Sequence, residues 1–254
     1  HNPLGKISVS TVVQKSSNRG AAQMGILLGP RKLYNYCKLF GFGEKTGIGI
    51  GGERIGILHQ PERWDGLTIT RLPMGHAVST TPMQVHNAMA TIANGGVLMK
   101  PKFINRVFDK TGKTITPFNI KPKRRVVSKN VATSLTEMLV SVVSNEGTAR
   151  NAKIEGFNIA GKTGTTQKLI NGKYSHKHHV GSFVGYFPAE DPEIVITVVV
   201  DEAKMKKGML GYGGTVAAPA FKNVAEKIIS YLGISPSDNS KSVASLNKII
   251  EKTL

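Results

Sequence analysis

Three closely spaced stretches rich in β-branched and aromatic residues most constrain what this chain can fold into. They cover residues 157–167, 182–187 and 193–201, and turn-forming residues bound each of them. Parallel strands need a long crossover, so short polar connections favour antiparallel pairing. We therefore expect a three-stranded antiparallel sheet, with a polar loop at residues 168–180 and a proline-bounded turn at residues 188–192.

Apolar residues at helical spacing flank this strand pattern on both sides. The segments are residues 16–37 with a break at Gly29-Pro30, residues 81–94 opened by the capping box Thr81-Pro82-Met83-Gln84, residues 131–147, and residues 215–233. Helices first, then strands, then a closing helix favour segregated layers. The sequence predicts an α+β fold, with a helical subdomain and an antiparallel sheet flanked by helices.

The same patterns predict how the chain is divided. We expect residues 1–234 to form one partial domain, mainly helical over 1–150 and carrying the strands and the closing helix over 151–234. Residues 235–254 form a polar C-terminal tail, and a short helix is expected at 243–254.

Composition narrows the classes of partner and cofactor. The 34 Lys and Arg residues against 16 Asp and Glu residues give a net charge of +18, which suits either an anionic neighbour or a diffusely basic surface. Basic and aromatic residues do not interleave as they do in single-strand binders, so no nucleic acid partner is expected. A single cysteine excludes an internal disulfide and a multi-thiolate metal site. No apolar run reaches the ~18 residues of a membrane span.

Three short patterns suggest other chemistry. Residues 156–163 match the phosphate-binding pattern G-x-x-x-x-G-K-T, but such a loop must open a helix, and here the surroundings alternate like a strand. Residues 47–52 match a dinucleotide pattern without the strand and helix that it needs. His176, His178 and His179 lack a nearby carboxylate or thiolate, so we expect a solvated cationic loop and no metal site. A nucleotidase remains a minor alternative.

The motif that we favour is Lys162-Thr163-Gly164-Thr165-Thr166, on the first predicted strand. A K-T-G strand beside an active-site serine supplies a cation, hydroxyl groups and a stretch where a peptide backbone can lie close. A second copy, Lys45-Thr46-Gly47, falls in a glycine-rich loop and is interpreted as a turn. Upstream, Ser16-Ser17-Asn18 supplies an S-x-N element at the start of a helix.

Further short blocks accompany these two motifs. Together the blocks are Lys15-Ser16-Ser17-Asn18, residues 41–47, 81–84, 92–97, Lys100-Pro101, 147–149, 160–165, 185–189, 212–214 and 217–219. With these blocks in the family's order, the chain resembles the class B penicillin-binding proteins from about residue 14 to residue 232, and the septal branch more than the elongation branch.

The resemblance implies a penicillin-binding serine D,D-transpeptidase, which cross-links peptidoglycan stem peptides through an acyl-enzyme. It implies that Ser16 relays a proton and that Asn18 holds the substrate amide and the catalytic lysine. Lys162 then supplies positive potential, while Thr163 and Thr165 bind the substrate's terminal carboxylate. The N–H of Thr165 donates to the oxyanion, and Gly164 keeps the strand approachable. No cofactor or metal is implied.

The family's nucleophile motif S-x-x-K is expected some tens of residues before Ser16, where the sequence has no match. Ser245-Leu246-Asn247-Lys248 and Ser237-Asp238-Asn239 match only by letters, in the tail. We therefore expect these residues alone to be inactive and to need the N-terminal half of the same domain as a partner. A scaffold without a nucleophile and a penicillin-hydrolysing or penicillin-sensing relative are the alternatives.

The resemblance also implies location and partners. The parent protein is expected in the cell membrane, anchored by an N-terminal helix, with this domain on the periplasmic side. β-Lactams are its expected covalent inhibitors, and septal membrane proteins are possible partners.

Overall fold

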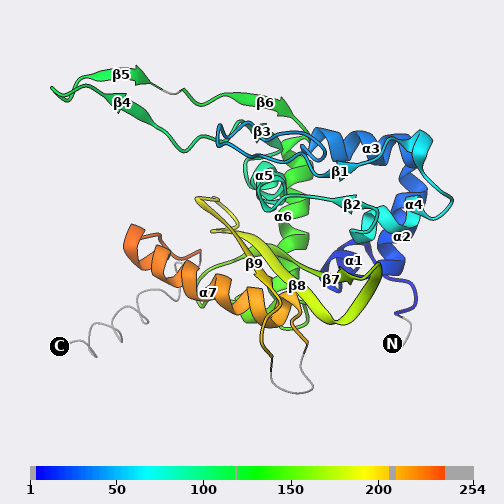
Figure 1. The fold of residues 1–254 in the computed structure, drawn as a ribbon. Helices are drawn as coiled ribbons and strands as arrows, with labels where there is room; N and C mark the ends of the chain where they lie inside the picture. Colours follow the sequence, from blue (N-terminus) through cyan, green and yellow to red (C-terminus); the bar gives the residue numbers. More distant parts are fainter. Residues whose placement is uncertain (1–3, 118, 206–209, 238–254) are drawn as a thin grey trace. The chain divides into compact units, whose positions relative to one another are not determined.

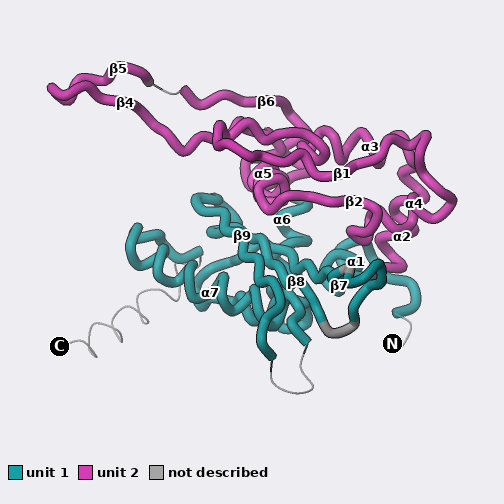
Figure 2. Tube along the Cα trace, in the orientation of Figure 1, with its two compact units in different colours: residues 1–17, 134–254 teal, residues 18–133 magenta. Residues whose placement is uncertain are grey.

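The computed structural model describes residues 4–117, 119–205 and 210–237, with the backbone alone at 117, 169, 176 and 177. The predicted helix at 243–254 and the tail copy of S-x-x-K lie outside the described residues, as do two of the three residues of the tail S-x-N. The chain forms two compact units (Figure 2). Unit 1 comprises residues 1–17 and 134–254, and unit 2 comprises residues 18–133, so unit 2 is inserted in the sequence of unit 1.

Helices and short strands alternate through the first half of the chain, and the long strands follow (Figure 1). The elements before the long strands are α1 (Val9–Gln14), α2 (Asn18–Leu28), α3 (Pro30–Leu39), β1 (Ile57–Leu58), η1 (Pro61–Arg63), α4 (Thr68–Arg71), η2 (Leu72–Met74), β2 (Val78–Ser79), α5 (Pro82–Ala93), β3 (Val97–Met99), β4 (Arg106–Phe108), β5 (Thr114–Pro117), β6 (Pro122–Arg125), α6 (Lys129–Val143) and η3 (Arg150–Ala152). They are followed by β7 (Ala160–Ile170), β8 (Lys173–Phe187), β9 (Ile194–Asp201) and α7 (Gly213–Leu232).

The predicted α+β class is confirmed, and so is the three-stranded antiparallel sheet. Its order is β7-β8-β9, with Lys162 opposite Val184 and Phe183 opposite Val198. The predicted helices are present as α2, α3, α5, α6 and α7. At α5 the capping box forms as expected, because the Thr81 hydroxyl accepts from the Gln84 N–H while the Gln84 side chain accepts from the Thr81 N–H.

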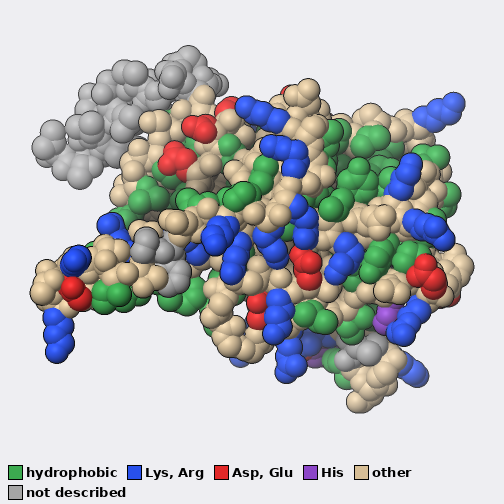
Figure 3. All heavy atoms as spheres, turned by 90° about the horizontal axis from the view of Figure 1, so that it is seen from above, with side chains coloured by type: hydrophobic (Ala, Val, Ile, Leu, Met, Phe, Trp, Pro, Cys, Tyr) green, Lys and Arg blue, Asp and Glu red, His purple; other side chains and the backbone are tan. Residues whose placement is uncertain are grey.

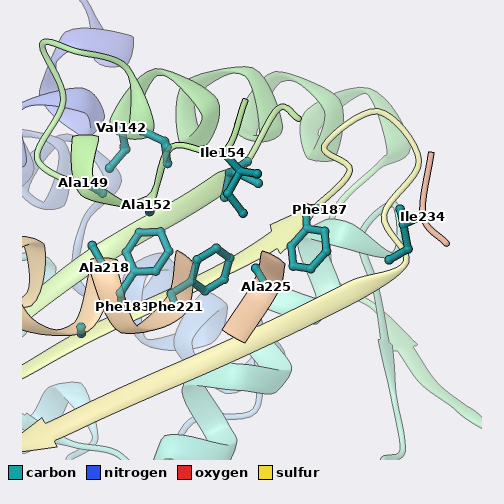
Figure 4. Packing of buried hydrophobic residues seen from close by; sticks show 13 residues of the cluster. Val142, Ala149, Ala152, Ile154, Phe183, Phe187, Ala218, Phe221, Ala225 and Ile234 are labelled. Atoms are coloured by element: carbon teal, nitrogen blue, oxygen red, sulfur yellow. The ribbon is translucent and has the colours of Figure 1, made fainter. Parts of the chain in front are cut away.

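The core of unit 1 lies where α7 packs against the sheet (Figure 4). Phe183 and Phe187 of β8 meet Phe221 of α7 edge-to-face, with ring centroids 4.8 and 6.1 Å apart. The central strand is buried on its other face as well, where the Tyr186 hydroxyl lies 2.7 Å from the Thr136 hydroxyl of α6. This packing fixes the strand that neighbours the K-T-G motif.

Our prediction of a polar loop at residues 168–180 is wrong. β7 and β8 run on as a long hairpin that turns at Asn171 and Gly172, both with positive φ. Its sequence mixes polar and apolar residues without the alternation that marks a half-buried strand.

Our prediction that the first part of the chain is mainly helical missed six strands. β1 to β6 are two to four residues long and form three two-stranded antiparallel sheets. Strands this short carry too little periodicity to be detected in a sequence. The domain boundary that we placed at residue 150 stays a prediction.

Candidate active site

Ser16 occupies a strained backbone position at the end of α1. Its φ is +51°, in the left-handed region that favours glycine. The N–H of Ser16 donates to the Val13 carbonyl and the N–H of Ser17 donates to the Val12 carbonyl, which is the Schellman arrangement at a helix C-terminus. Such a position usually carries glycine, so a serine here points to a use for its hydroxyl group.

Two side chains attach this turn to the segment after α6. The Gln14 amide donates to the Ser144 hydroxyl at 3.2 Å, and the Lys15 ammonium donates to the Glu146 carbonyl at 2.8 Å. Lys15 also pairs with the Glu146 carboxylate at 3.4 Å. The position of Ser16 is therefore fixed from both its backbone and its neighbours.

Lys162 meets Ser16 directly. Its Nζ donates to the Ser16 Oγ at 2.9 Å and to the Thr163 carbonyl at 3.2 Å, although the two side chains are 146 residues apart in the sequence. Burial lowers the pKa of the Lys162 ammonium from 10.5 to about 8, because the charged form loses its hydration. The structure thus brings together the predicted relay serine and the predicted cleft cation.

Thr163 lies on the opposite face of β7 from Lys162. It pairs with the buried Phe183, and its hydroxyl lies 2.9 Å from the hydroxyl of Thr148. Either hydroxyl can be the donor in that contact. Thr148 therefore sets the rotamer of Thr163 from outside the strand.

Gly164 and Thr165 contact different neighbours. A Cβ at Gly164 would lie 2.5 Å from the Ser182 hydroxyl, so only glycine fits without a shift. The exposed Thr165 accepts a hydrogen bond from the Gly213 N–H at 3.1 Å through its hydroxyl, and this caps the N-terminus of α7. A hydroxyl that accepts from Gly213 still has its own hydrogen to donate to a ligand.

Glycines let the first turn of α7 approach the K-T-G strand closely. A Cβ at Gly213 would overlap the carbonyl oxygens of Ser182 and Gly164, and a Cβ at Gly214 would overlap the carbonyl oxygen of Thr148. The N–H groups and the positive end of a 20-residue helix therefore lie against the strand that carries Thr163 and Thr165.

Asn18, the remaining predicted site residue, is the first residue of α2 and belongs to unit 2. Its side chain is exposed. Its role stays a prediction.

The second K-T-G copy has a structural partner of its own. Thr46 is buried, and its N–H and hydroxyl both donate to the Glu53 carboxylate, while the Gly47 N–H donates to the other oxygen at 3.3 Å. These bonds hold the pKa of the Glu53 carboxyl below its usual value, the Thr46 hydroxyl contributing most. The loop is thus closed on itself, as the interpretation as a turn implies.

The phosphate-binding pattern and the histidine pattern both extend into strands of the sheet. Lys162 and Thr163 lie inside β7, where a phosphate loop would open a helix, so residues 156–163 are not a phosphate loop. His178 and His179 are consecutive strand residues, and successive side chains point to opposite faces. Our expectation of a solvated loop is wrong for His179, which is buried against the ring of Tyr212.

Thr148, Gly213 and Gly214 are the neighbours of the site to which the sequence interpretation gave no role. They stand in the blocks 147–149 and 212–214, which had contributed only to the resemblance. Their position in those blocks was the available signal. Their contact with β7 joins residues far apart in sequence, so it is visible only in the fold.

With this geometry in place, comparison with known proteins decides the family. The model of the penicillin-binding protein transpeptidase domain matches residues 1–226. The chain belongs to this family. Stage V sporulation protein D of Bacillus subtilis is 42% identical over 232 residues, which are 90% of this chain and 35% of that protein. The probable peptidoglycan D,D-transpeptidase PenA of Neisseria flavescens is 30% identical, over 91% of this chain and 54% of that protein.

Solved structures of the family have the same fold. Penicillin-binding protein 3 of Mycobacterium tuberculosis, in complex with aztreonam, matches with a TM-score of 0.83 and 30% identity, over 91% of this chain and 53% of that one. The transpeptidase domain of Burkholderia pseudomallei penicillin-binding protein 3 matches with a TM-score of 0.81 and 31% identity, over 92% of this chain and 67% of that one. The relatives place the chain among the class B transpeptidase domains, of whose curated members it spans about a third to a half.

Proposed function

We propose that this chain is part of a penicillin-binding peptidoglycan D,D-transpeptidase, which transfers an acyl group between stem peptides through a serine ester. The observation that carries the proposal is the 2.9 Å contact between the Lys162 Nζ and the Ser16 Oγ. A serine hydroxyl beside a half-buried amine of lowered pKa can pass a proton to or from a reacting group.

We propose the following roles for the site residues. Ser16 relays the proton between the nucleophile and the leaving amine, and Asn18 holds the substrate amide and the catalytic lysine. Lys162 keeps the surroundings of Ser16 positive. The hydroxyls of Thr163 and Thr165 bind the substrate carboxylate, close to the N-terminus of α7. Gly164 leaves room for the peptide backbone, and the Thr165 N–H donates to the oxyanion.

We propose that a part of the domain outside these 254 residues supplies the S-x-x-K nucleophile, and that the 254 residues by themselves do not carry out acyl transfer. The oxygen of this nucleophile attacks the acyl carbonyl, the leaving amine takes the proton through Ser16, and the acceptor amine then reverses these steps. Complexes of the tuberculosis relative with aztreonam and ampicillin support β-lactams as covalent inhibitors.

We also propose a place in the cell for the parent protein. It is an envelope enzyme held by an N-terminal membrane helix, acting on the periplasmic side and contacting septal membrane proteins. Relatives named for sporulation and for division, such as the peptidoglycan D,D-transpeptidase FtsI of Buchnera aphidicola, support action at a septum. Among the described residues, none of the helices is both long and apolar enough to span a membrane.

Covalent labelling by a fluorescent penicillin tests the function. Residues 1–254 alone are expected to form no stable adduct, because Ser16 is placed as a relay and a misplaced hydroxyl reacts poorly. Adding the upstream half of the domain, fused or as a separate chain, is expected to give stoichiometric labelling by intact-mass spectrometry. An adduct mapped to a serine of these 254 residues, or no labelling of the completed domain, contradicts the proposal.

The two K-T-G copies provide a matched pair of variants in the completed domain. Lys162→Ala is expected to slow acylation by about a hundredfold, the usual scale for losing an electrostatic or proton-transfer group. Lys45→Ala changes a lysine of the other copy and is expected to leave the rate nearly unchanged. Equal losses would show that the wrong copy had been assigned to the site.

A further inference from the structure

An exposed two-stranded hairpin in unit 2 is not explained by the transpeptidase reaction. Residues 100–117 and 119–121, here called the hairpin arm, carry β4 and β5, which pair with each other and extend away from the other elements of unit 2 (Figure 1). Within the described residues this sheet holds two strands, so each keeps one open edge. A lone two-stranded hairpin is only marginally stable in water, which favours a partner that covers it.

The hairpin arm exposes an unusual amount of apolar surface. Six large apolar side chains in it are between 42% and 69% exposed: Phe103, Ile104, Val107, Phe108, Ile115 and Ile120. The Arg106 guanidinium lies 5.4 Å from the centre of the Phe108 ring, so a cation and an aromatic face are already paired. Phe and Arg are enriched at protein interfaces.

The charged side chains of the hairpin arm are mostly basic. The arm has one acidic residue, Asp109, and six basic residues: Lys100, Lys102, Arg106, Lys110, Lys113 and Lys121. The Asp109 carboxylate accepts from the Thr111 hydroxyl at 2.6 Å and from the Thr111 and Lys113 N–H groups, so it is engaged in the turn. The partner that complements this surface is acidic.

The order of the residues distinguishes the kinds of acidic partner. Arg106 and most of the exposed apolar residues lie in the middle of the arm, and the five lysines lie at its base and tip, like the apolar centre and charged rim of a protein interface. The tip, residues 109–113, is polar and would be the first part to enter a bilayer, which disfavours membrane insertion. An open strand edge also suits an added strand.

We propose that the hairpin arm is a docking surface for an extended acidic segment of a partner protein, in which carboxylates alternate with apolar residues. The segment adds to an open edge of the two-stranded sheet. Its carboxylates line one face of the added strand and pair with basic side chains of the arm, and its apolar side chains line the other face and contact exposed apolar ones. The proposal does not depend on the acyl-transfer activity.

Peptides of about ten residues, long enough to span a strand, test this proposal. A labelled peptide that alternates glutamate and valine is expected to bind the full chain saturably in fluorescence anisotropy, more weakly as salt rises. The same peptide with lysine in place of glutamate is expected not to bind. In NMR spectra the shifts caused by binding are expected to fall on the hairpin arm.

Variants locate the binding. The double variant Lys110→Glu/Lys113→Glu is expected to weaken binding about tenfold or more, and Lys110→Gln/Lys113→Gln by less, since each exposed charge pair contributes a modest amount. The same reversal at Lys153 and Lys227 of unit 1 is the control and is expected to change little. Absent binding, or equal binding after reversal at the tip, overturns the proposal. Competition by phosphatidylglycerol vesicles, but not phosphatidylcholine vesicles, would assign the surface to lipid and also overturn it.

Discussion

The left-handed backbone at Ser16 lowers the stability of the fold, whereas the proposed chemistry needs the hydroxyl group of this residue. The left-handed conformation costs a residue other than glycine about 1 to 2 kcal/mol. We expect Ser16→Gly to raise the free energy of unfolding by up to about 1 kcal/mol in urea denaturation.

In the completed domain the same Ser16→Gly change is expected to reduce penicillin acylation by about a hundredfold, because the relay hydroxyl is gone. Ser16→Ala, which loses the hydroxyl without relieving the backbone, is the matched control and is expected to lose acylation without gaining stability. A Ser16→Gly variant that gained stability and kept full acylation would leave Ser16 a structural role only.

Burial of Lys162 gives the stability of the chain a defined pH dependence. The folded-state pKa is about 8 against 10.5 when exposed, so between these values the unfolded chain binds more protons and stability rises with pH. Below about pH 8 the folded protein bears the cost of a buried charge, about 1 to 3 kcal/mol. Urea unfolding of the chain and of Lys162→Met, from pH 7 to 10.5, should show this extra slope in the unsubstituted protein alone. Parallel curves would contradict it.

The same titration predicts that the acylation rate of the completed domain falls at alkaline pH. As Lys162 loses its proton above about pH 8, its electrostatic contribution to the reaction falls. Lys162→Arg keeps its charge throughout this range, so its decline is expected at higher pH even if its rate is lower. The ratio of the two acylation rates, followed by stopped-flow mixing with penicillin, measures the shift. A ratio constant with pH would show that another group governs the decline.

At the scale of elements, the approach of α7 to β7 depends on Gly213. A methyl group there would overlap the carbonyl oxygens of Ser182 and Gly164. We expect Gly213→Ala to lower the free energy of unfolding by about 1 to 3 kcal/mol and to slow acylation in the completed domain, because the strand or the helix must shift. Gly66→Ala, in open space at an ordinary φ, is the control and is expected to be nearly neutral. Equal effects would contradict the tight contact.

Elements with strong periodicity or caps were predictable from the sequence. Thr81 and Gln84 mark the start of α5 in the sequence, and β9 is a run of β-branched residues that ends at Asp201. The extension of the β7–β8 hairpin was missed because its polar and apolar residues do not alternate. Strands such as β1 and β2 are two residues long, and they are defined by their pairing with each other because so short a sequence has no pattern of its own.

The motifs indicated candidate site residues such as Lys162 and Ser16, but not the contacts between them. The 2.9 Å bond between these two side chains depends on the Schellman turn and on the contact of Lys15 with Glu146. Thr148 stood in the block 147–149, but the sequence did not indicate which residue it contacts. Its hydroxyl meets that of Thr163 only in the fold.

At the scale of the whole molecule, the +18 charge is spread over the surface. Figure 3 shows Lys and Arg side chains dispersed over the face it draws, with Asp and Glu side chains fewer between them. Like charges repel in the compact state, and salt screens that repulsion. We expect the Tm to rise by about 2 °C or more between roughly 20 and 200 mM NaCl in differential scanning fluorimetry. A falling Tm would mean that ion pairs such as Arg124–Glu44 dominate instead.

The insertion of unit 2 in the sequence of unit 1 also affects the order in which the two units are synthesised. A ribosome makes Lys162 146 residues after Ser16. At about 5 to 20 residues per second, that interval is roughly 7 to 30 s. Unit 2 is synthesised entirely within it and can collapse while the first strand of the sheet is still unmade. A nascent chain stalled before residue 160 therefore contains Ser16 but not the lysine that contacts it.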